Sequence, residues 1–396
     1  MPLSKIGTNS IENFSITSSD LANTAIDDKG ITANTVNQAL KTAGTHLNHM
    51  KNRLINGEMV LWQRGTTITN SGTWTTNNND SYVADRWYNL SDGNDIIDYT
   101  RQTADPAPRD ENANAATNFN DGGIYYMRLD VETANKKFGI AQIIEGIHGY
   151  DLAGQKVTLS FKARVSATTN LDNVKAAVIH WQGSANAVTS NFISTWNAEG
   201  TNPTFITNAV VVNDTTPENL NVTTTWQKYV INATIPDTND ATHGNVCVFI
   251  WSDVTTTSVG EFLYISDVQL ESGTEATPYD RRNYMFEVDL CRRYFQFAQF
   301  EYGHAQNYDS YFNDGQWRVA RTGSTGEMRT TASVQRSGNF GSTANNNAGG
   351  QNIGFKNIQG QSTNFVVNFG YDEAKQYWAS MGRSKGRPQL AFNAEL

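Results

Sequence analysis

Charged residues are scarce in this chain of 396 residues. Asp, Glu, Lys and Arg make up 17% of it, against about 25% in an average globular protein. The balance is acidic, with a formal net charge of -9 at pH 7, which suits neither a nucleic-acid backbone nor an anionic membrane surface. Hydrophobic residues still make up 38% and aromatic residues 11%, enough to build cores. The composition therefore argues against nucleic-acid binding and against disorder, and it favours strands and turns over long helices.

Long hydrophobic runs and cysteine frameworks are also missing. The longest apolar run, Val246 to Trp251, is too short to span a bilayer, and residues 1–14 lack the features of a secretory signal. Cys247 and Cys291 fit neither a disulfide framework nor a metal-ligand spacing. The sequence thus predicts a protein that folds in a reducing cytoplasm, without membrane insertion and without a cofactor.

The sequence also lacks the common catalytic motifs. It contains no Gly-x-Ser-x-Gly, P-loop, His-Glu-x-x-His or Cys-x-x-Cys pattern, and we expect no enzyme. His46 and His49 could together bind a metal ion, but a position of both residues on a solvated helix face is favoured. The acidic turns at residues 92–95 and 120–122 offer oxygen ligands of the kind that calcium binds, yet neither continues into a full calcium loop. We therefore interpret both as plain turns and predict no metal site.

The N-terminal 56 residues predict an arm followed by a helix. Residues 1–30 are polar with isolated apolar residues, so they predict an extended arm that docks on a partner. In residues 31–56 apolar residues alternate at steps of three and four, which predicts an oligomerising helix. A single amphipathic helix packed on its own domain is the alternative. The predicted seam consists of Ala33, Val36, Leu40, Ala43, Leu47, Met50 and Leu54.

Beyond residue 57 the apolar pattern changes to a period of two. Residues 57–280 predict an antiparallel β-sandwich, and residues 281–396 a smaller β-rich domain with a helix over Met285–Phe297. Residues 105–121 predict a long loop. The predicted strands are Met59–Gln63, Arg86–Tyr88, Tyr125–Val131, Ile140–Ile144, Val157–Val165, Ala177–Trp181, Trp226–Ile235, Val246–Trp251 and Phe262–Leu270.

Aromatic residues in polar surroundings are the strongest functional signal. A flat ring with a polar rim suits a sugar face, because the ring stacks on CH groups while neighbouring amides and carboxylates bind hydroxyls. Trp74 and Trp196 lie in Thr- and Asn-rich segments, and Trp181 and Trp251 lie in strands; burial in a core is the alternative for each. The predicted ligand-binding residues are Trp196, Trp181, Trp251, Tyr308, Tyr311 and Trp317.

Three stretches resemble a known family. They are Asn52–Met59 with 62–67 and 84–87, then 267–279, and finally Glu287 with 291–295. Together they resemble virion proteins of tailed bacteriophages and prophages, usually tail fibres or receptor-binding appendages. The resemblance implies a jelly roll like that of carbohydrate-binding modules, trimeric assembly and adhesion. It carries over no catalytic residues.

The resulting expectation is a mainly β protein of four parts. These are a virion-docking arm at residues 1–30, a trimeric coiled coil at 31–56, a jelly-roll sandwich at 57–280 and a C-terminal β-rich domain at 281–396. The leading hypothesis is a homotrimeric tail fibre, part of the virion, which binds host-surface glycan and other virion proteins. One alternative is a capsid-decorating, head-fibre or tail-connector protein without receptor binding, and another is a polysaccharide depolymerase.

Overall fold

A computed structural model shows the fold. It describes residues 51–103, 124–237, 244–299 and 389–395, together with the backbone of short strands between residues 316 and 370. By its internal contacts the chain divides into two units, Met1–Lys51 and Asn52–Leu396. The predicted arm, most of the predicted helix and the predicted loop at 105–121 lie outside the described residues.

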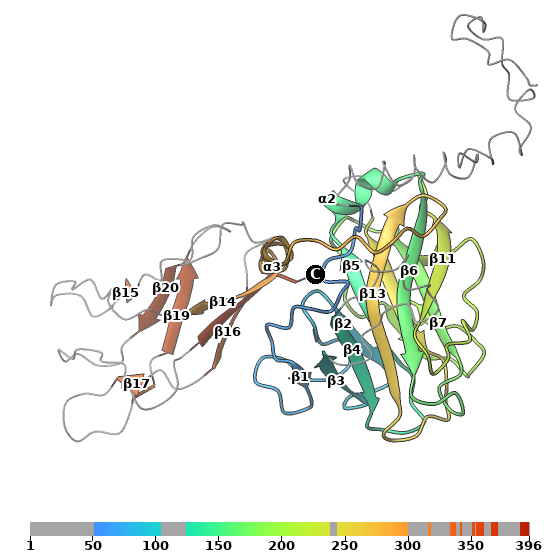
Figure 1. Ribbon diagram of the computed structural model, residues 1–396. Helices are drawn as coiled ribbons and strands as arrows, with labels where there is room; N and C mark the ends of the chain where they lie inside the picture. Colours follow the sequence, from blue (N-terminus) through green and yellow to red (C-terminus); the bar gives the residue numbers. More distant parts are fainter. Residues whose placement is uncertain are drawn as a thin grey trace, which may run out of the picture. The chain divides into compact units, whose positions relative to one another are not determined.

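Two antiparallel sheets pack face to face as a β-sandwich (Figure 1). Every strand pairing within them is antiparallel, which confirms the mainly β, antiparallel prediction. The first sheet has, in order, β1 (Thr67–Ile68), β3 (Ile97–Gln102), β4 (Tyr126–Val131), β13 (Phe262–Ser272), β6 (Lys156–Val165) and β11 (Gln227–Thr234). The second has, in order, β10 (Ala209–Val211), β7 (Val174–Trp181), β12 (Val246–Ser252), β5 (Phe138–Ile144) and β2 (Tyr88–Ser91).

The main core lies between the two sheets. Alternate side chains of β6 and β12 face it, such as Leu159 and Phe161 from one sheet and Val248 and Ile250 from the other. Because side chains alternate along a strand, the remaining residues of each strand face outward. Burial of these inner faces is the main source of the free energy that stabilises the sandwich.

A second apolar layer covers the outer face of the second sheet. It involves residues 182–208, here called the strap, which contain the short strands β8 (Ile193–Thr195) and β9 (Thr204–Phe205). Phe192 and Ile193 of the strap pack on Phe249 and Trp251 of β12. The strands β5, β7 and β12 are therefore buried on both faces.

Buried charges anchor one end of the strap. Asp253 pairs with Lys137 and, at 2.8 Å, with Lys175, and all three side chains are almost fully buried. The Asp253 carboxylate also accepts a hydrogen bond from the backbone of Gly200 (2.9 Å), and the Lys137 ammonium donates one to the Ala198 carbonyl (3.1 Å). These contacts join residues 198–200 of the strap to the end of β12.

Most of the predicted strands from residue 125 to residue 270 are confirmed within a few residues at their ends. The strand predicted over Met59–Gln63 is wrong, because Asn56 and Met59 have φ angles of 57° and 59°, in the left-handed region, and turns follow. Arg86 also has a positive φ, so the strand predicted from Arg86 starts instead at Tyr88.

The segment that follows the sandwich begins with a helix. α3 (Tyr284–Arg292) is capped by Asn283, whose side chain accepts a hydrogen bond from the backbone of Met285 (3.0 Å). The helix predicted over Met285–Phe297 is therefore too long, because β14 (Phe295–Gln299) pairs with the distant β21 (Gln389–Asn393). Two shorter helices, α2 (Gly146–Gly149) and η2 (Tyr150–Leu152), follow β5.

The remaining strands form small antiparallel sheets. β16 (Ser333–Ser337) pairs with β21, on the side opposite β14, and completes a three-stranded sheet. β15 (Gln316–Trp317), β20 (Val366–Gly370) and β19 (Gly354–Gln359) form a second sheet, in that order. β17 (Gly341–Ser342) pairs with β18 (Gln351–Asn352). No helix in the described part of the chain is long and apolar enough to cross a membrane.

Candidate functional site

A cavity of about 390 Å³ opens beside Trp74. This volume falls in the range of about 300–1,000 Å³ that is typical of small-molecule sites. Two short segments supply most of its lining, residues 72–76 and 80–82, and Arg64 and Asn393 complete it. The lining is mixed, with one indole, one phenol, several hydroxyls, a carboxylate and a guanidinium.

A tight turn shapes the segment that carries Trp74. The backbone N–H groups of Gly72 and Asn77 both donate to the carbonyl of Thr69, at 3.4 and 3.2 Å. A Cβ atom at Gly72 would lie 2.0 Å from the carbonyl oxygen of Thr75, so only glycine fits there. The Thr75 hydroxyl donates to the Tyr82 carbonyl (2.6 Å) and thereby ties the two lining segments together.

Aromatic contacts hold the Trp74 ring in place. Phe297 packs edge-on against it, with the ring centroids 4.9 Å apart, and the indole remains half-buried. On the other lining segment, Tyr82 packs against Tyr88 of β2. A half-buried ring held by a fixed neighbour loses little conformational freedom when a ligand stacks on it.

Arg64 contributes a buried charge to the lining. Its side chain is 2% exposed, and its guanidinium stacks on Phe295 (3.7 Å to the ring centroid) and lies 5.2 Å from the Tyr82 centroid. Glu395, at 3.2 Å, and Asp85, at 3.9 Å, balance its charge. Its Nη1, the atom nearest Asp85, is buried and has no hydrogen-bond partner among the described residues.

The two other ionisable groups of the cavity hold their protons more tightly than usual. Burial raises the pKa of Asp80, although a hydrogen bond with Ser190 opposes that shift. Burial, and then the negative charge of Glu395, raise the pKa of Tyr82 well above its ordinary value. At neutral pH Tyr82 therefore carries a phenol and not a phenolate. The cavity thus combines an aromatic face with neutral hydroxyls, one carboxyl group and one guanidinium, a set that suits the face and hydroxyls of a sugar ring.

The strap covers two of the tryptophans predicted to bind ligand. Trp251 is 0% exposed and stacks on Phe249 (4.7 Å between centroids, 7° between planes), and Trp181 is 8% exposed. Both belong to the apolar layer under the strap. Their assignment as binding residues is therefore wrong, because a period-two pattern cannot show that a sheet's outer face is also covered.

Trp196 is less buried than Trp181 and Trp251. It lies in the strap, is half-buried, and packs against Phe249 with the ring centroids 6.0 Å apart. The structure does not bring it into the cavity at Trp74. Its role in ligand binding remains a prediction, but its contact with the covered sheet is structural.

We expect Trp196→Ala to destabilise the protein. Truncation removes the packing of the indole on Phe249, and a half-buried tryptophan should contribute about 2 kcal/mol. The melting temperature should fall by roughly 4–8 °C, measured by differential scanning calorimetry. An unchanged melting temperature together with weaker host adsorption would instead identify Trp196 as an exposed binding ring.

The other predicted site residues divide into two groups. Tyr308 and Tyr311 lie outside the described residues, as do the predicted seam residues Val36, Leu40, Ala43, Leu47 and Met50, and for Trp317 only the backbone is described. Leu54, in contrast, is fully buried in the sandwich core, and residues 51–56 are not helical. Leu54 is therefore a core residue, and its assignment to the seam is wrong.

The stretches that carry the family resemblance meet in space. The Asn56 side chain donates to the carbonyls of Leu61 (2.8 Å) and Asp85 (3.0 Å), while its backbone N–H donates to Glu287. A Cβ atom at Gly57 would lie 2.0 Å from the carbonyl oxygen of Val268, which explains the glycine.

Two arginines complete this junction. The Arg86 guanidinium lies 3.6 Å from the centroid of the Tyr294 ring and pairs with Glu395, and Arg293 pairs with Glu145 at 2.9 Å. The resemblance therefore rests largely on residues that hold residues 284–295 and 393–395 against the sandwich.

The sequence places Trp74 in a polar segment, but Trp74 is not among the predicted ligand-binding residues. The signal was present, because Trp74 stands between threonines in an Asn-rich segment. Arg64, Asp80 and Tyr82 gave no local signal, and Asn393 is more than three hundred positions away along the chain. The fold alone brings them together.

The chain is similar in structure to several solved proteins at low sequence identity. No protein-family model and no curated protein matches the chain. Among solved structures it is similar to the enzymatically active domain of bacteriophage CBA120 tailspike protein 4, with 14% identity over 57% of this chain and 22% of that chain and a TM-score of 0.31. A CBM4 structure is 16% identical over 55% of this chain and 98% of that chain, with a TM-score of 0.24. A Stig cyclase from Fischerella sp. TAU is 9% identical over 56% and 96%, with a TM-score of 0.31.

These similarities correct one expectation. The absence of catalytic motifs led us to expect no enzyme, but the similar structures include an enzymatically active tailspike domain and a cyclase. The expectation of no enzyme is therefore withdrawn. At these TM-scores the similarities assign no activity, substrate or partner to this chain.

Proposed function

We propose that this chain is a phage virion fibre or appendage protein that binds host-surface glycan in the cavity beside Trp74. The observation that carries the glycan part is the half-buried indole of Trp74, which lines the cavity with hydroxyls, a carboxyl group and a guanidinium. The resemblance of the stretches around residues 50–90 and 262–296 to phage virion proteins supports the virion part.

Each group in the cavity has a role in this proposal. Trp74 stacks on the CH face of a sugar ring, and Asp80 accepts hydrogen bonds from hydroxyls. Because Glu395 and Asp85 already balance the charge of Arg64, the cavity offers no net positive charge to an acidic sugar. We therefore expect neutral glycans to bind better than sulfated or carboxylated ones.

A trimer would strengthen weak binding at such a site. In this proposal residues 1–30 dock on the particle and residues upstream of Lys51 trimerise through the predicted seam. Three weak sites on one particle raise avidity without new contacts. Analytical ultracentrifugation of the full chain should then show a trimer at micromolar concentration, and a monomer would contradict this part.

Glycan binding can be tested on the purified chain. A microarray of bacterial surface glycans should show binding to neutral saccharides, and the free protein should compete with phage for adsorption to the host. Incubation with the same glycans also reports on catalysis, because the release of shorter saccharides would identify a polysaccharide depolymerase.

The alternative is a head-fibre, capsid-decorating or tail-connector protein without receptor binding. Antibody labelling of the particle separates these assignments, because a tail fibre is labelled at the tail and a decorating protein at the head. Labelling confined to the head, with no glycan bound on the array, would replace the adhesion proposal.

A further inference from the structure

A lysine, an asparagine and an aspartate meet under one end of the strap. Lys175 lies in β7, and its ammonium donates to Oδ1 of Asn202 (2.9 Å) and lies 2.8 Å from a carboxylate oxygen of Asp253. The Asp253 and Lys175 side chains are almost fully buried, and Asn202 of the strap is partly buried. A nitrogen nucleophile therefore contacts both a carboxamide and a carboxylate that can take its proton.

The buried charges of this cluster do not balance. Lys137 also pairs with Asp253, so two ammonium groups face one carboxylate. In the described part of the chain, neither lysine has a second carboxylate partner. Burial of an uncompensated charge is costly. A reaction that removes one of the two positive charges is therefore favoured.

The neighbours of the cluster hold the reacting groups in place. Lys175 is paired with Trp251 across β7 and β12, and Trp251 is fully buried. On the strap, the carbonyl of Asn202 accepts a hydrogen bond from the Asn197 side chain (2.7 Å), and its Nδ2 donates to the carbonyl of Pro217 (3.2 Å). Because both partners are already fixed, little entropy is lost when they react.

The residue after Asn202 closes off a competing reaction. An asparagine side chain commonly loses its amide when the backbone nitrogen of the next residue attacks the side-chain carbonyl and forms a succinimide. That next residue is Pro203, which has no backbone N–H. The amine of Lys175 is therefore the nucleophile in contact with this carboxamide.

We propose that Lys175 and Asn202 form an intramolecular amide bond that fastens the strap to β7. Asp253 takes a proton from the Lys175 ammonium, and the neutral amine attacks Cγ of Asn202. The Nζ–Cγ bond forms and the Cγ–Nδ2 bond breaks. Asp253 passes two protons in all from Nζ to the leaving nitrogen, which departs as ammonium, and the carboxylate is regenerated. The step needs no oxidant, reductant or co-reactant.

The bond resolves the charge imbalance. The new amide carries no charge, so Lys137 and Asp253 remain as a balanced buried pair. It also supplies a covalent link of a kind that does not depend on redox conditions, whereas Cys247 and Cys291 are both free. The proposal is independent of glycan binding.

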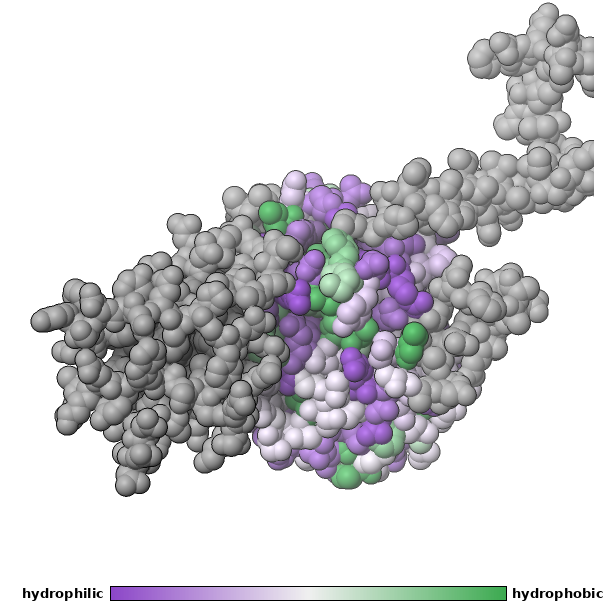
Figure 2. All heavy atoms as spheres, turned by 60° about the vertical axis from the view of Figure 1, so that its left-hand side comes forward, coloured by the Kyte–Doolittle hydropathy of each residue, from purple (hydrophilic) through white to green (hydrophobic). Residues whose placement is uncertain are grey.

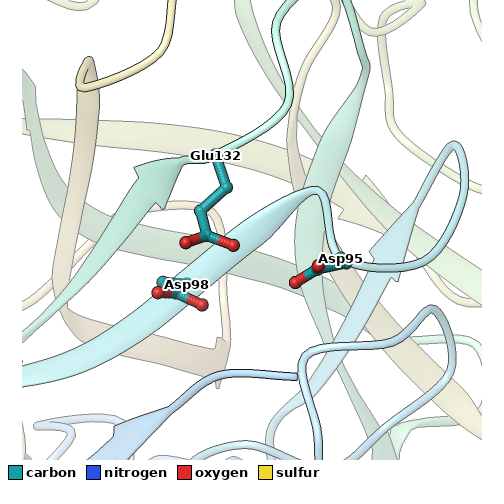
Figure 3. Close-up of side chains that lie close together, drawn as sticks. All are labelled: Asp95, Asp98 and Glu132. Carbon is teal, nitrogen blue, oxygen red and sulfur yellow. The ribbon is translucent and has the colours of Figure 1, made fainter. Parts of the chain in front are cut away.

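The surface of the molecule shows different features. On the face drawn in Figure 2, apolar residues form small separate areas among polar ones. Figure 3 shows the carboxylates of Asp95, Asp98 and Glu132 close together, and the Asn77 side chain donates to Asp95 (2.8 Å) and Asp98 (2.9 Å). That group contains no amine, so an amide bond of the proposed kind cannot form there.

Mass spectrometry of the purified full chain tests the bond. The measured mass should be lower than the mass of the linear sequence by about 17 Da, the mass of one ammonia. Trypsin does not cleave after an acylated lysine, so no peptide should end at Lys175, and residues 165–228 should appear as one internally linked peptide. A succinimide elsewhere loses the same mass but leaves Lys175 open to trypsin.

Matched variants identify the three groups. Lys175→Met and Asn202→Ala should each keep the full mass, because the nucleophile or the carboxamide is missing. Asp253→Asn should keep it too, since no carboxylate takes the proton and both lysines retain their charge. Lys156→Met removes an exposed lysine that pairs with Asp214 and should still lose ammonia. A wild type of full mass that trypsin cleaves after Lys175 would overturn the proposal, as would a link that persists in Asn202→Ala.

Discussion

Asp253→Asn should lower the melting temperature by roughly 10–15 °C. The substitution keeps the shape of the side chain but removes the single negative charge that faces the ammonium groups of Lys137 and Lys175, whose side chains are 2% and 5% exposed. Breaking a buried ion pair costs about 3–5 kcal/mol, because an uncompensated charge remains in a poorly solvated site. For a domain of this size each kcal/mol corresponds to about 2–4 °C. Differential scanning calorimetry measures the shift.

The same variant should loosen the strap. Gly200 donates its backbone N–H to Asp253, so the loss of the carboxylate weakens the anchor at residues 198–200. Limited proteolysis should then cut the strap earlier than in the wild type. The matched control is Asp214→Asn, which removes an exposed pair with Lys156 (2.9 Å) and should change stability by less than about 1 kcal/mol. Equal shifts in the two variants would mean that the buried cluster is not the anchor.

Glu395→Gln should have the second-largest effect. Its carboxylate is 4% exposed and pairs with Arg64 and Arg86, which are 2% and 1% exposed. The neutral amide leaves two buried guanidinium groups short of one counter-charge, at a cost of about 3–5 kcal/mol. We expect the loss to fall mainly on the contact of residues 393–395 with the sandwich, because both arginines belong to the sandwich side.

Hydrogen exchange can localise that loss. Backbone amides of Ala394 and Glu395 should exchange much faster in Glu395→Gln, while those of β6 and β12 keep most of their protection. Glycan binding should also weaken, because Arg64 and Asn393 both line the cavity. If the whole sandwich lost protection to the same extent as residues 393–395, the junction would not be a separate unit of stability.

The strands of the sandwich were predictable where one face is apolar and the other polar. β11 alternates in this way, and β4 nearly does, so the period-two pattern located them. The second sheet reads as continuous apolar runs, in β7 and β12 above all, because the strap buries its outer face. A period-two pattern therefore predicts the strands but not the third layer. It does not show that Trp251 is buried, and so Trp251 is wrongly predicted to bind ligand.

The errors in the elements came from long-range pairing and backbone conformation. The apolar spacing at Met285–Phe297 continues past Arg292, but Phe295 pairs with Asn393, a partner that local sequence cannot reveal. The run at Met59–Gln63 has strand-like composition, yet left-handed residues at Asn56 and Met59 prevent an extended conformation. In both places tertiary contacts outweighed local propensity.

The candidate sites were only partly predictable for the same reason. Trp74 carries its signal in its neighbours, and the acidic turn at residues 92–95 was visible as a source of oxygen ligands. The residues that surround them come from elsewhere: Arg64 and Asn393 line the cavity, and Asn77 and Glu132 lie beside Asp95 of the acidic turn. Only the pairing of β3 with β4 brings Glu132 beside Asp98.

The most direct test of the glycan proposal compares the wild type with Trp74→Ala for binding to purified host-surface polysaccharide. In this proposal the half-buried indole is the stacking surface of the cavity, so its removal should cost about 2 kcal/mol of binding free energy, or roughly thirtyfold in Kd. Trp74→Phe, which keeps a smaller ring, should lose less. Calorimetric titration measures all three proteins, and their melting temperatures verify that each is folded. Weakening in the order wild type, Phe, Ala is the predicted result, and equal affinity of the wild type and a folded Trp74→Ala would contradict the proposal that this cavity binds glycan.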